Sequence, residues 1–188
     1  MMLMDLRDRV GRVHLEEIED AMAGYVLTPN DDAFVRRHDM FHTDLFGNAL
    51  DHFGPCHEDG ILSVMDFSAF SEDPEYYYEV YFPYVDYAFM SYDGDDMGHL
   101  RSWIRHVWEM GLCIVTATMG ERGSLSYNGE RYSEGGILVP PRVVNTVGAG
   151  DSYIVGFTYG LIKRWDMPLC QRKGAELSSE VISKFDPY

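Results

Sequence analysis

The chain has 188 residues, 46% of them hydrophobic, so it is long and apolar enough to fold around a core. Its formal net charge of −16 opposes binding to nucleic acid or to an anionic membrane surface, because both depend on Lys and Arg side chains that neutralise phosphates. The cysteines Cys56, Cys113 and Cys170 are far apart, which argues against a disulfide framework and favours a reducing, cytoplasmic location.

The first elements are expected to be short. Residues 4–15 alternate loosely and are compatible with a two-stranded ribbon that turns near residues 8–11, or with a frayed polar terminus. Thr28 and Pro29 are typical of a helix start, and the helix should continue to Arg37.

A strand and a second helix are predicted next. Residues 38–43 predict a core strand, and Asp44 is placed to cap a helix over residues 45–53. His52, Cys56 and His57 cluster locally without the spacing of a zinc site, and the loop composition around Pro55 favours a surface turn there.

Two predicted strands lead into acidic residues. Residues 61–66 form the first and end at Asp66, and residues 84–90 form the second, with Asp95 following in the next loop. A carboxylate at the carboxyl end of a strand lies where open α/β sheets place ligands. Each acid could instead cap the turn or helix that follows it.

The middle of the chain predicts a helix, a buried strand, a glycine turn and a hairpin. Residues 97–108 carry apolar side chains at helical spacing, and residues 111–118 form a continuous apolar run typical of a central parallel strand. Gly120 and Gly123 would let the backbone approach a ligand closely. Residues 124–132 predict a β-hairpin whose Asn-Gly pair suits a type I′ turn.

Residues 143–153 combine a β-branched start, typical of a strand end, with Gly148 and Gly150. The residues that follow have one apolar face at helical spacing: Ile154, Phe157 and Leu161. Glycines at such a turn leave the first N–H groups of the helix uncovered, and the helix dipole adds partial positive charge there. This arrangement predicts a site for a phosphate or another anion.

Asp151 lies at the mouth of this predicted helix. Its carboxylate can cap the helix, or it can accept a proton from a substrate hydroxyl. After a break at residues 166–168 a last helix is expected. Strands that alternate with helices in this way predict an α/β fold with a mostly parallel sheet.

Residues 145–152, Asn-Thr-Val-Gly-Ala-Gly-Asp-Ser, resemble the C-terminal signature of the PfkB (ribokinase-like) carbohydrate kinases, usually Asp-Thr-x-Gly-Ala-Gly-Asp-Ser/Thr-Phe. The resemblance implies ATP-dependent phosphorylation of a sugar hydroxyl. It also implies that Asp151 is the general base and that three amides form an anion hole over the transferring phosphoryl group: those of Gly148, Ala149 and Gly150.

The resemblance extends to the nucleotide and its cations. It implies that five residues lie beside ATP or a monovalent cation: Thr118, Gly120, Gly123, Asn145 and Thr146. Asn145 stands where the family usually has Asp, so this departure bears on the monovalent cation. Asp66 and Asp95 fall near positions that the family uses to order Mg²⁺ and phosphates.

The implied fold is the three-layer α/β/α ribokinase-like fold without its N-terminal portion. Residues 1–15 would be the remnant of a lid that covers the sugar, and residues 16–188 the nucleotide-binding domain. Because the family's early sugar-binding Asp and its Gly-Gly motif are not found, the chain resembles the C-terminal two-thirds of such a kinase. Family members often pair through their lids, which makes a homodimer an expectation.

Within the family, residues 66–68, 85–91 and 118–124 look most like fructoselysine 6-kinases, which implies a small-molecule fructosamine-type substrate. Two alternatives fit part of the pattern. A dinucleotide oxidoreductase is disfavoured because Tyr153 occupies the position of the third fingerprint glycine. A non-catalytic or truncated nucleotide-binding relative is favoured by the missing front and by Asn145, and it stays open.

Overall fold

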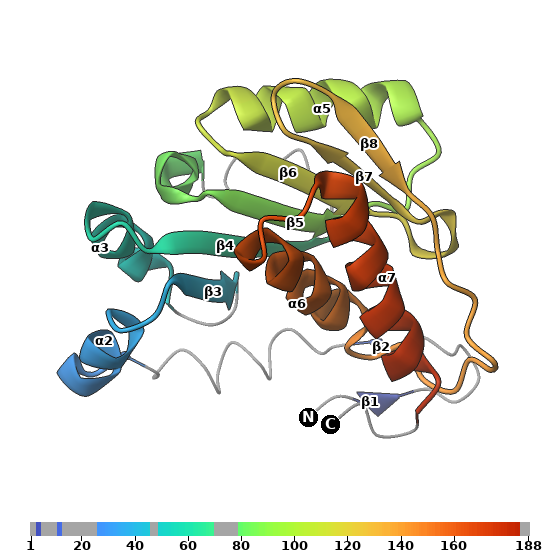
Figure 1. Ribbon diagram of the computed structural model, residues 1–188, viewed down its shortest axis with the longest axis horizontal. Coiled ribbons are helices and arrows are strands. Elements are labelled where there is room, and N and C mark those ends of the chain that lie inside the picture. The colour runs from blue at the N-terminus through green and yellow to red at the C-terminus, as the bar shows by residue number, and fades with distance from the viewer. Residues whose placement is uncertain (1–2, 5–10, 13–25, 46–48, 70–78, 185–188) are drawn as a thin grey trace. The chain divides into compact units, whose positions relative to one another are not determined.

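The computed structural model describes residues 3–4, 11–12, 26–45, 49–69 and 79–184 (Figure 1). The chain divides into two compact units. The first contains Met1–Leu15, Thr118–Ser126 and Ser133–Tyr188, and the second contains Glu16–Ala117 and Tyr127–Tyr132.

The chain starts with a short antiparallel ribbon. Strand β1 (Leu3–Met4) pairs with β2 (Gly11–Arg12), which confirms the predicted ribbon for these residues. The turn expected near residues 8–11 lies mostly outside the described residues.

Helix α2 (Pro29–Val35) begins where the sequence predicts and ends two residues before Arg37. Its start is a capping box, in which the Thr28 hydroxyl accepts a hydrogen bond from the Asp31 amide and the Thr28 amide donates to the Asp31 carboxylate. The Thr28 hydroxyl also donates to this carboxylate, and this bond is the main reason why the pKa of Asp31 lies below its usual value. Local capping chemistry therefore fixes this helix.

Strand β3 (Met40–Asp44) agrees with the predicted strand. Of the helix predicted over residues 45–53, residues 46–48 lie outside the described residues, and the described remainder is not one α-helix, so that part of the prediction is wrong. A 3₁₀ turn, η1 (Leu50–His52), comes first, and α3 (Phe53–Glu58) follows. The predicted surface turn around Cys56 is therefore also wrong. Phe53 and Cys56 are buried one helical turn apart, and a proline in the first turn of a helix loses no internal hydrogen bond.

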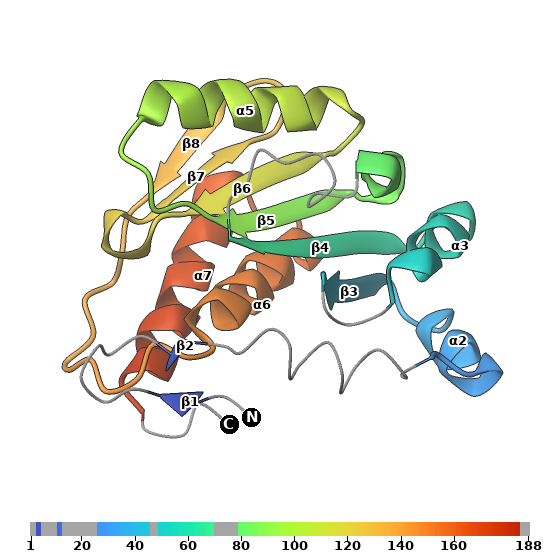
Figure 2. The same ribbon diagram turned by 180° about the vertical axis from the view of Figure 1, so that it is seen from behind.

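Two parallel strand pairs form the core of the second unit. Strand β4 (Leu62–Ala69) lies between β3 and β5 (Tyr87–Ser91), parallel to both. Strand β4 continues three residues beyond Asp66, and β5 begins three residues later than predicted because residues 79–84 form a 3₁₀ segment, η2 (Glu79–Tyr84). Consecutive residues of both strands are buried, so both faces of each strand are covered. Seen from behind, α3 lies beside the start of β4 (Figure 2).

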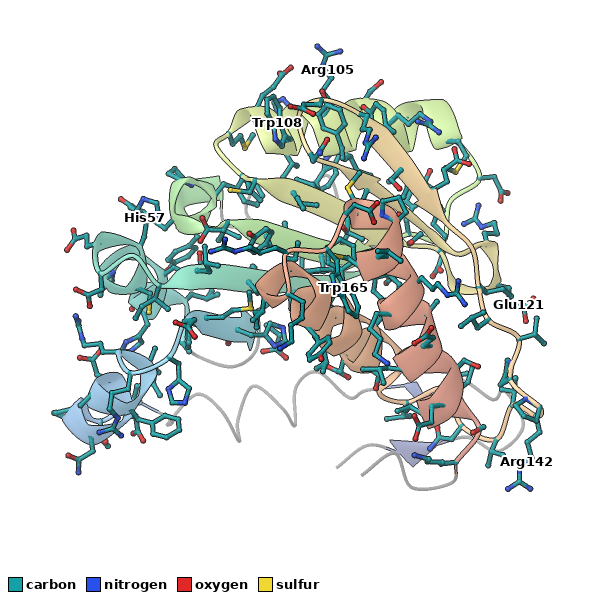
Figure 3. All side chains as sticks on the ribbon, in the orientation of Figure 1. His57, Arg105, Trp108, Glu121, Arg142 and Trp165 are labelled. Atoms are coloured by element: carbon teal, nitrogen blue, oxygen red, sulfur yellow. The ribbon has the colours of Figure 1, made fainter. Side chains whose placement is uncertain are left out.

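Helix α5 (Met97–Glu109) confirms the predicted helical spacing. The Asp96 carboxylate caps it by accepting a hydrogen bond from the His99 amide at 2.9 Å. The apolar face is buried through three residues, Leu100, Ile104 and Val107. Arg105 projects away from the ribbon on the opposite side, as Figure 3 shows. Strand β6 (Ile114–Thr118) follows, three residues later than expected.

Strands β7 (Ser124–Tyr127) and β8 (Tyr132–Gly135) confirm the hairpin, but the predicted type I′ turn is wrong. Four residues separate the strands, and of the Asn-Gly pair only Gly129 has a positive φ, at 87°. The Asn128 side chain instead accepts hydrogen bonds from the amides of Glu130 and Arg131, at 3.2 and 3.0 Å. An Asx-type turn has therefore replaced the tight turn.

Helices α6 (Ala149–Ile162) and α7 (Met167–Ile182) lie side by side in Figures 1 and 2. The strand end predicted at residues 143–147 is wrong, because no strand is assigned there. The Val144 and Asn145 amides donate instead to the Ile182 carbonyl at the end of α7, at 2.8 and 3.3 Å. The loop that leads into α6 is thus tied to α7.

Backbone hydrogen bonds join six strands in the order β3-β4-β5-β6-β7-β8. This mixed, mostly parallel sheet with its connecting helices confirms the predicted α/β class. Within the described ranges, the helices are all too short or too polar to cross a membrane.

Replacing Gly156 with Ala is expected to destabilise the chain by about 1–3 kcal/mol. A Cβ on Gly156 of α6 would lie 2.5 Å from the Lys173 carbonyl oxygen of α7, and backbone atoms cannot rotate away as a flexible side chain could. Gly54 of α3 is the matched control, since a Cβ there meets nothing within 4 Å and Gly54→Ala should be neutral or stabilising. Urea unfolding followed by circular dichroism measures both changes, and equal midpoints would contradict this close packing.

Candidate functional site

The N-terminus of α6 presents backbone amides that have no acceptor among the described residues. Gly148 is the residue before the helix and adopts a left-handed conformation with φ 76° and ψ 5°. The Ala149 amide donates to the Thr146 carbonyl at 3.2 Å. Within the described part of the chain, the amides of Gly148, Gly150 and Asp151 have no acceptor in the protein. These three N–H groups, at the positive end of the helix dipole, are suited to bind an anion.

Asp151 lies in the first turn of α6 with its side chain exposed. It is not the capping residue, because that position belongs to Gly148 and the helix has no side-chain cap. Among the described residues its carboxylate has no hydrogen-bond or ion-pair partner. A Cβ placed on the neighbouring Gly150 meets no atom within 4 Å. The carboxylate is therefore available beside open backbone.

Asn145 and Thr146 fold the turn that leads into α6. The Asn145 side-chain oxygen accepts a hydrogen bond from the Val147 amide at 3.0 Å, and the Thr146 carbonyl accepts the Ala149 amide. A carboxylate at position 145 could accept the same bond. The departure from Asp to Asn therefore keeps the local turn and removes one negative charge from it.

The turn after β6 also belongs to the first unit, from Thr118 onward. It contains a 3₁₀ segment, η3 (Gly120–Arg122), and it is closed by a hydrogen bond from the Met119 amide to the Gly123 carbonyl at 2.8 Å. A Cβ on Gly120 would meet nothing within 4 Å, whereas a Cβ on Gly123 would overlap the Gly135 carbonyl oxygen of β8. Gly120 thus offers open backbone, and Gly123 serves the packing of the turn.

Glu121 of this turn and Arg142 of the loop before α6 both point away from the ribbon in Figure 3. Both side chains are exposed. The first unit therefore carries an exposed acidic side chain in the turn after β6 and an exposed basic side chain in the loop before α6.

Asp66 and Asp95 belong to the second unit, whereas the other predicted site residues belong to the first. Asp66 lies inside β4, and its carboxylate accepts a hydrogen bond from the Ser68 amide at 2.8 Å, where Ser68 has a φ of 58°. The alternative role of Asp66, in which its carboxylate caps the backbone that follows it, is therefore present. Asp95 is exposed in the loop between β5 and α5.

Within the described ranges, His, Cys, Asp and Glu residues form no group of three or more that could hold a metal ion. Mg²⁺ does not need such a cage, because proteins often bind it through one or two carboxylates together with substrate phosphates. Asp66 and Asp95 each carry a carboxylate, the ligand type of that second mode, and they lie inside β4 and in the loop after β5.

Sequence reasoning missed a buried polar cluster that begins two residues after Asp151. The Tyr153 hydroxyl donates to the Ser124 hydroxyl at 2.8 Å, and Gln171 of α7 contacts the same serine. Burial raises the pKa of the Tyr153 phenol, so the group stays a protonated donor. The available signal was Tyr153 itself, which stands where the PfkB signature usually ends in Phe.

The fold is the α/β fold of ribokinase-like proteins. The described structure resembles an Arabidopsis thaliana ribokinase complexed with ribose and ATP, with a TM-score of 0.72 at 14% identity, over 86% of this chain and 55% of that one. A microbiome-derived acarbose kinase gives a TM-score of 0.74 at 17% identity, over 88% and 56%. At these identities the likeness shows the fold alone.

Residues 87–188, more than half of the chain, match the family described as pfkB family carbohydrate kinase. The chain belongs to this family. It is 30% identical to a fructoselysine 6-kinase of Shigella flexneri over 171 residues, which are 91% of this chain and 64% of that protein. A shorter match, to a 5-dehydro-2-deoxygluconokinase of Geobacillus kaustophilus, has 37% identity over 47% of this chain and 25% of that protein. The chain thus spans less than two-thirds of these relatives.

Gly148→Ala is expected to destabilise the chain by about 1–2 kcal/mol, because a side chain at φ 76° is strained. Gly150→Ala is the matched control in the same turn, since that residue is already in the helix and its Cβ would meet nothing. Thermal unfolding measures both changes. If Gly148→Ala melted at or above the temperature of Gly150→Ala, the left-handed start of α6 would not be required.

Proposed function

We propose that the chain carries the nucleotide site and the general base of a kinase that transfers phosphate from ATP to a hydroxyl of a sugar or sugar derivative. The observation that carries this proposal is the exposed Asp151 carboxylate beside amides at the start of α6 that have no acceptor among the residues that the structure describes. Membership of the pfkB family supports the reaction class. The similarity to proteins named fructoselysine 6-kinase supports a fructosamine-type substrate.

In this proposal, five residues hold the nucleotide and its monovalent cation: Thr118, Gly120, Gly123, Asn145 and Thr146. All belong to the first unit, and Gly120 leaves open backbone at which a bound ligand can approach closely. When bound, ATP supplies the phosphoryl group, and Mg²⁺ neutralises part of its charge. Gly123 contributes through the fold of its turn rather than through open space.

Asp151 would act on the acceptor hydroxyl. Its carboxylate takes the proton from the substrate O–H group, so that the oxygen becomes a stronger nucleophile. The amides of Gly148 and Gly150 would donate hydrogen bonds to the negative oxygens of the group in transfer, and Ala149 would contribute if its amide left Thr146. These dipoles are already oriented by the helix, so little reorganisation is needed during the reaction.

Two further assignments belong to the same proposal. Residues 1–15 would be the remnant of a lid and residues 16–188 the nucleotide-binding domain, and the antiparallel pairing of β1 with β2 supports the first part. We also propose a homodimer that pairs through the lid, and a cytoplasmic location, because the family resemblance implies both.

A non-catalytic nucleotide-binding protein is the second candidate. The observation that favours it is Asn145, which stands where the family usually has Asp and so removes one negative charge from the turn before α6. Titration with ATP and Mg²⁺, followed by an assay of ADP released in the presence of fructoselysine, separates the two. Binding of ATP without sugar-dependent release of ADP would favour this candidate.

Asp151→Asn should retain ATP binding and lose roughly 10²- to 10⁴-fold in turnover, because the amide cannot accept the proton. Glu130→Gln is the matched control: it removes the same charge from an exposed side chain in the loop between β7 and β8. Calorimetry measures ATP binding, and coupled ADP detection measures turnover. Wild-type turnover in Asp151→Asn would refute the role of Asp151 as base.

Asp66→Asn and Asp95→Asn should each raise the Mg²⁺ concentration needed for half-maximal ATP binding by several-fold, because each removes a negatively charged oxygen ligand. An Asn at position 66 can still accept the Ser68 amide, so the local turn at Ser68 should persist. Asp51→Asn is the charge-matched control from the 3₁₀ turn before α3. Unchanged Mg²⁺ dependence in both variants would remove these residues from the metal site.

A further inference from the structure

A cluster of buried polar side chains joins four elements of the first unit. Its members are Ser124 and Ser126 of β7, Ser133 of β8, Tyr153 of α6 and Gln171 of α7. Ser124, Ser126 and Gln171 are at most 1% exposed, and Tyr153 is 7% exposed. Such side chains are costly to bury unless their hydrogen bonds are satisfied, so their partners indicate what the cluster does.

The Gln171 side chain has a fixed orientation. Its Nε2 lies 3.0 Å from the Ser133 carbonyl oxygen, which can only accept, so this atom must be the amide nitrogen. The two N–H groups of Nε2 are shared between this carbonyl and the hydroxyls of Ser124 and Ser126, which lie 3.2 and 3.1 Å away. The Ser133 hydroxyl donates to Gln171 Oε1 at 2.6 Å. Gln171 therefore anchors α7 to both strands of the hairpin.

Ser124 Oγ is the point at which the two helices meet in this cluster. It accepts one hydrogen bond from the Tyr153 hydroxyl at 2.8 Å and one from Gln171 at 3.2 Å, which use both of its lone pairs. Loss of the Tyr153 hydroxyl would leave a buried acceptor on Ser124 unsatisfied, and such an acceptor carries a desolvation penalty.

The chain leaves space for this cluster at two glycines. A Cβ on Gly135 would lie 2.6 Å from Ser124 Oγ and 2.9 Å from the Gln171 Cβ. A Cβ on Gly174 would lie 2.8 Å from the ring of Tyr153. Larger residues at either position would displace the tyrosine or the glutamine. The cluster is thus part of how the first unit packs, and the polar groups are not incidental.

We infer that the Tyr153 hydroxyl is a positioning group that sets the first turn of α6 against the turn at residues 118–124. Tyr153 follows Asp151 by two residues, and Ser124 directly follows Gly123, so the 2.8 Å hydrogen bond ties the two glycine turns together. The kinetic part of this inference rests on the proposed function. The PfkB signature usually has Phe at this position, so the hydroxyl is a feature of this chain beyond the motif.

The test compares Tyr153→Phe with the wild-type chain by amide hydrogen exchange. The amide of Ser152, which donates to the Gly148 carbonyl at 3.0 Å, and the amides of Met119 and Gly123 should exchange about fivefold faster in the variant. Exchange in the buried face of α5 should not change. Unchanged exchange at Ser152, or an equal increase in α5, would overturn the inference, because the hydroxyl would then have no local or only a general structural effect.

Turnover provides the second measurement. Tyr153→Phe should lower kcat about tenfold, with the affinity for ATP changed less than twofold, because the nucleotide contacts remain and their alignment with Asp151 is lost. An unchanged kcat in an active enzyme would overturn the kinetic part of the inference. If the wild-type chain showed no turnover, the proposed function would fail, while hydrogen exchange would still decide whether the hydroxyl holds the turn.

Two further variants serve as controls. Tyr132→Phe also removes one phenol hydrogen bond, to the Arg101 carbonyl at 2.7 Å in the second unit, and it should leave exchange at Ser152 unchanged. Ser124→Ala removes the same bond from the other side, together with the contact to Gln171, so exchange at Ser152 should rise at least as much as in Tyr153→Phe, even if that variant folded poorly. The double variant should be no worse than the more affected single variant, and additive effects would show that the two residues act independently.

Discussion

Among the described residues, the backbone amides at the start of α6 have no acceptors, so other contacts must hold this turn in place. Three anchors do so. The Asn145 side chain accepts a hydrogen bond from the Val147 amide. The Ile182 carbonyl accepts hydrogen bonds from the amides of Val144 and Asn145. The Tyr153 hydroxyl donates to the Ser124 hydroxyl. Each anchor uses a group other than the amides of Gly148 and Gly150. The open amides can therefore stay oriented toward a ligand without a partner in the protein.

Two of these anchors depend on how closely α6 packs against α7. Gly156 and Gly174 bring the two backbones into close contact, because a Cβ at either position would overlap the opposite helix. The last turn of α7 can then receive the loop that leads into α6. Stabilising the helix pair and shaping the site are thus one requirement, and a bulky substitution far from Asp151 would disturb both.

A chain with a net charge of −16 would repel a phosphate at long range. Local dipoles at a helix N-terminus act over a few ångströms and depend little on net charge. A divalent cation held by carboxylates and phosphates would further reduce the repulsion. Acidic composition and anion binding are therefore compatible, provided that the anion is met by amides rather than by a basic surface.

Where the structure-forming signal is local, the sequence by itself determined the outcome. Thr28, Asp96 and Asp166 cap the helices that follow them, apolar spacing marked α5 and α6, and the glycine motif marked the family and the open turn. Strand starts were placed three residues early at β5 and β6, because apolar residues precede both strands. Propensity alone does not show where strand pairing begins.

Only the tertiary structure decided features that depend on distant partners. Residues 143–147 look like a strand, but the amides of Val144 and Asn145 donate to the end of α7. In the hairpin, the Asn128 side chain accepts two backbone amides and so forms a wider turn than the predicted type I′ turn. No local pattern shows that Tyr153 and Gln171 meet at Ser124, since the three residues come from separate elements. Periodicity records which side of an element is buried, whereas a hydrogen bond between elements exists only once packing has brought its donor and acceptor together.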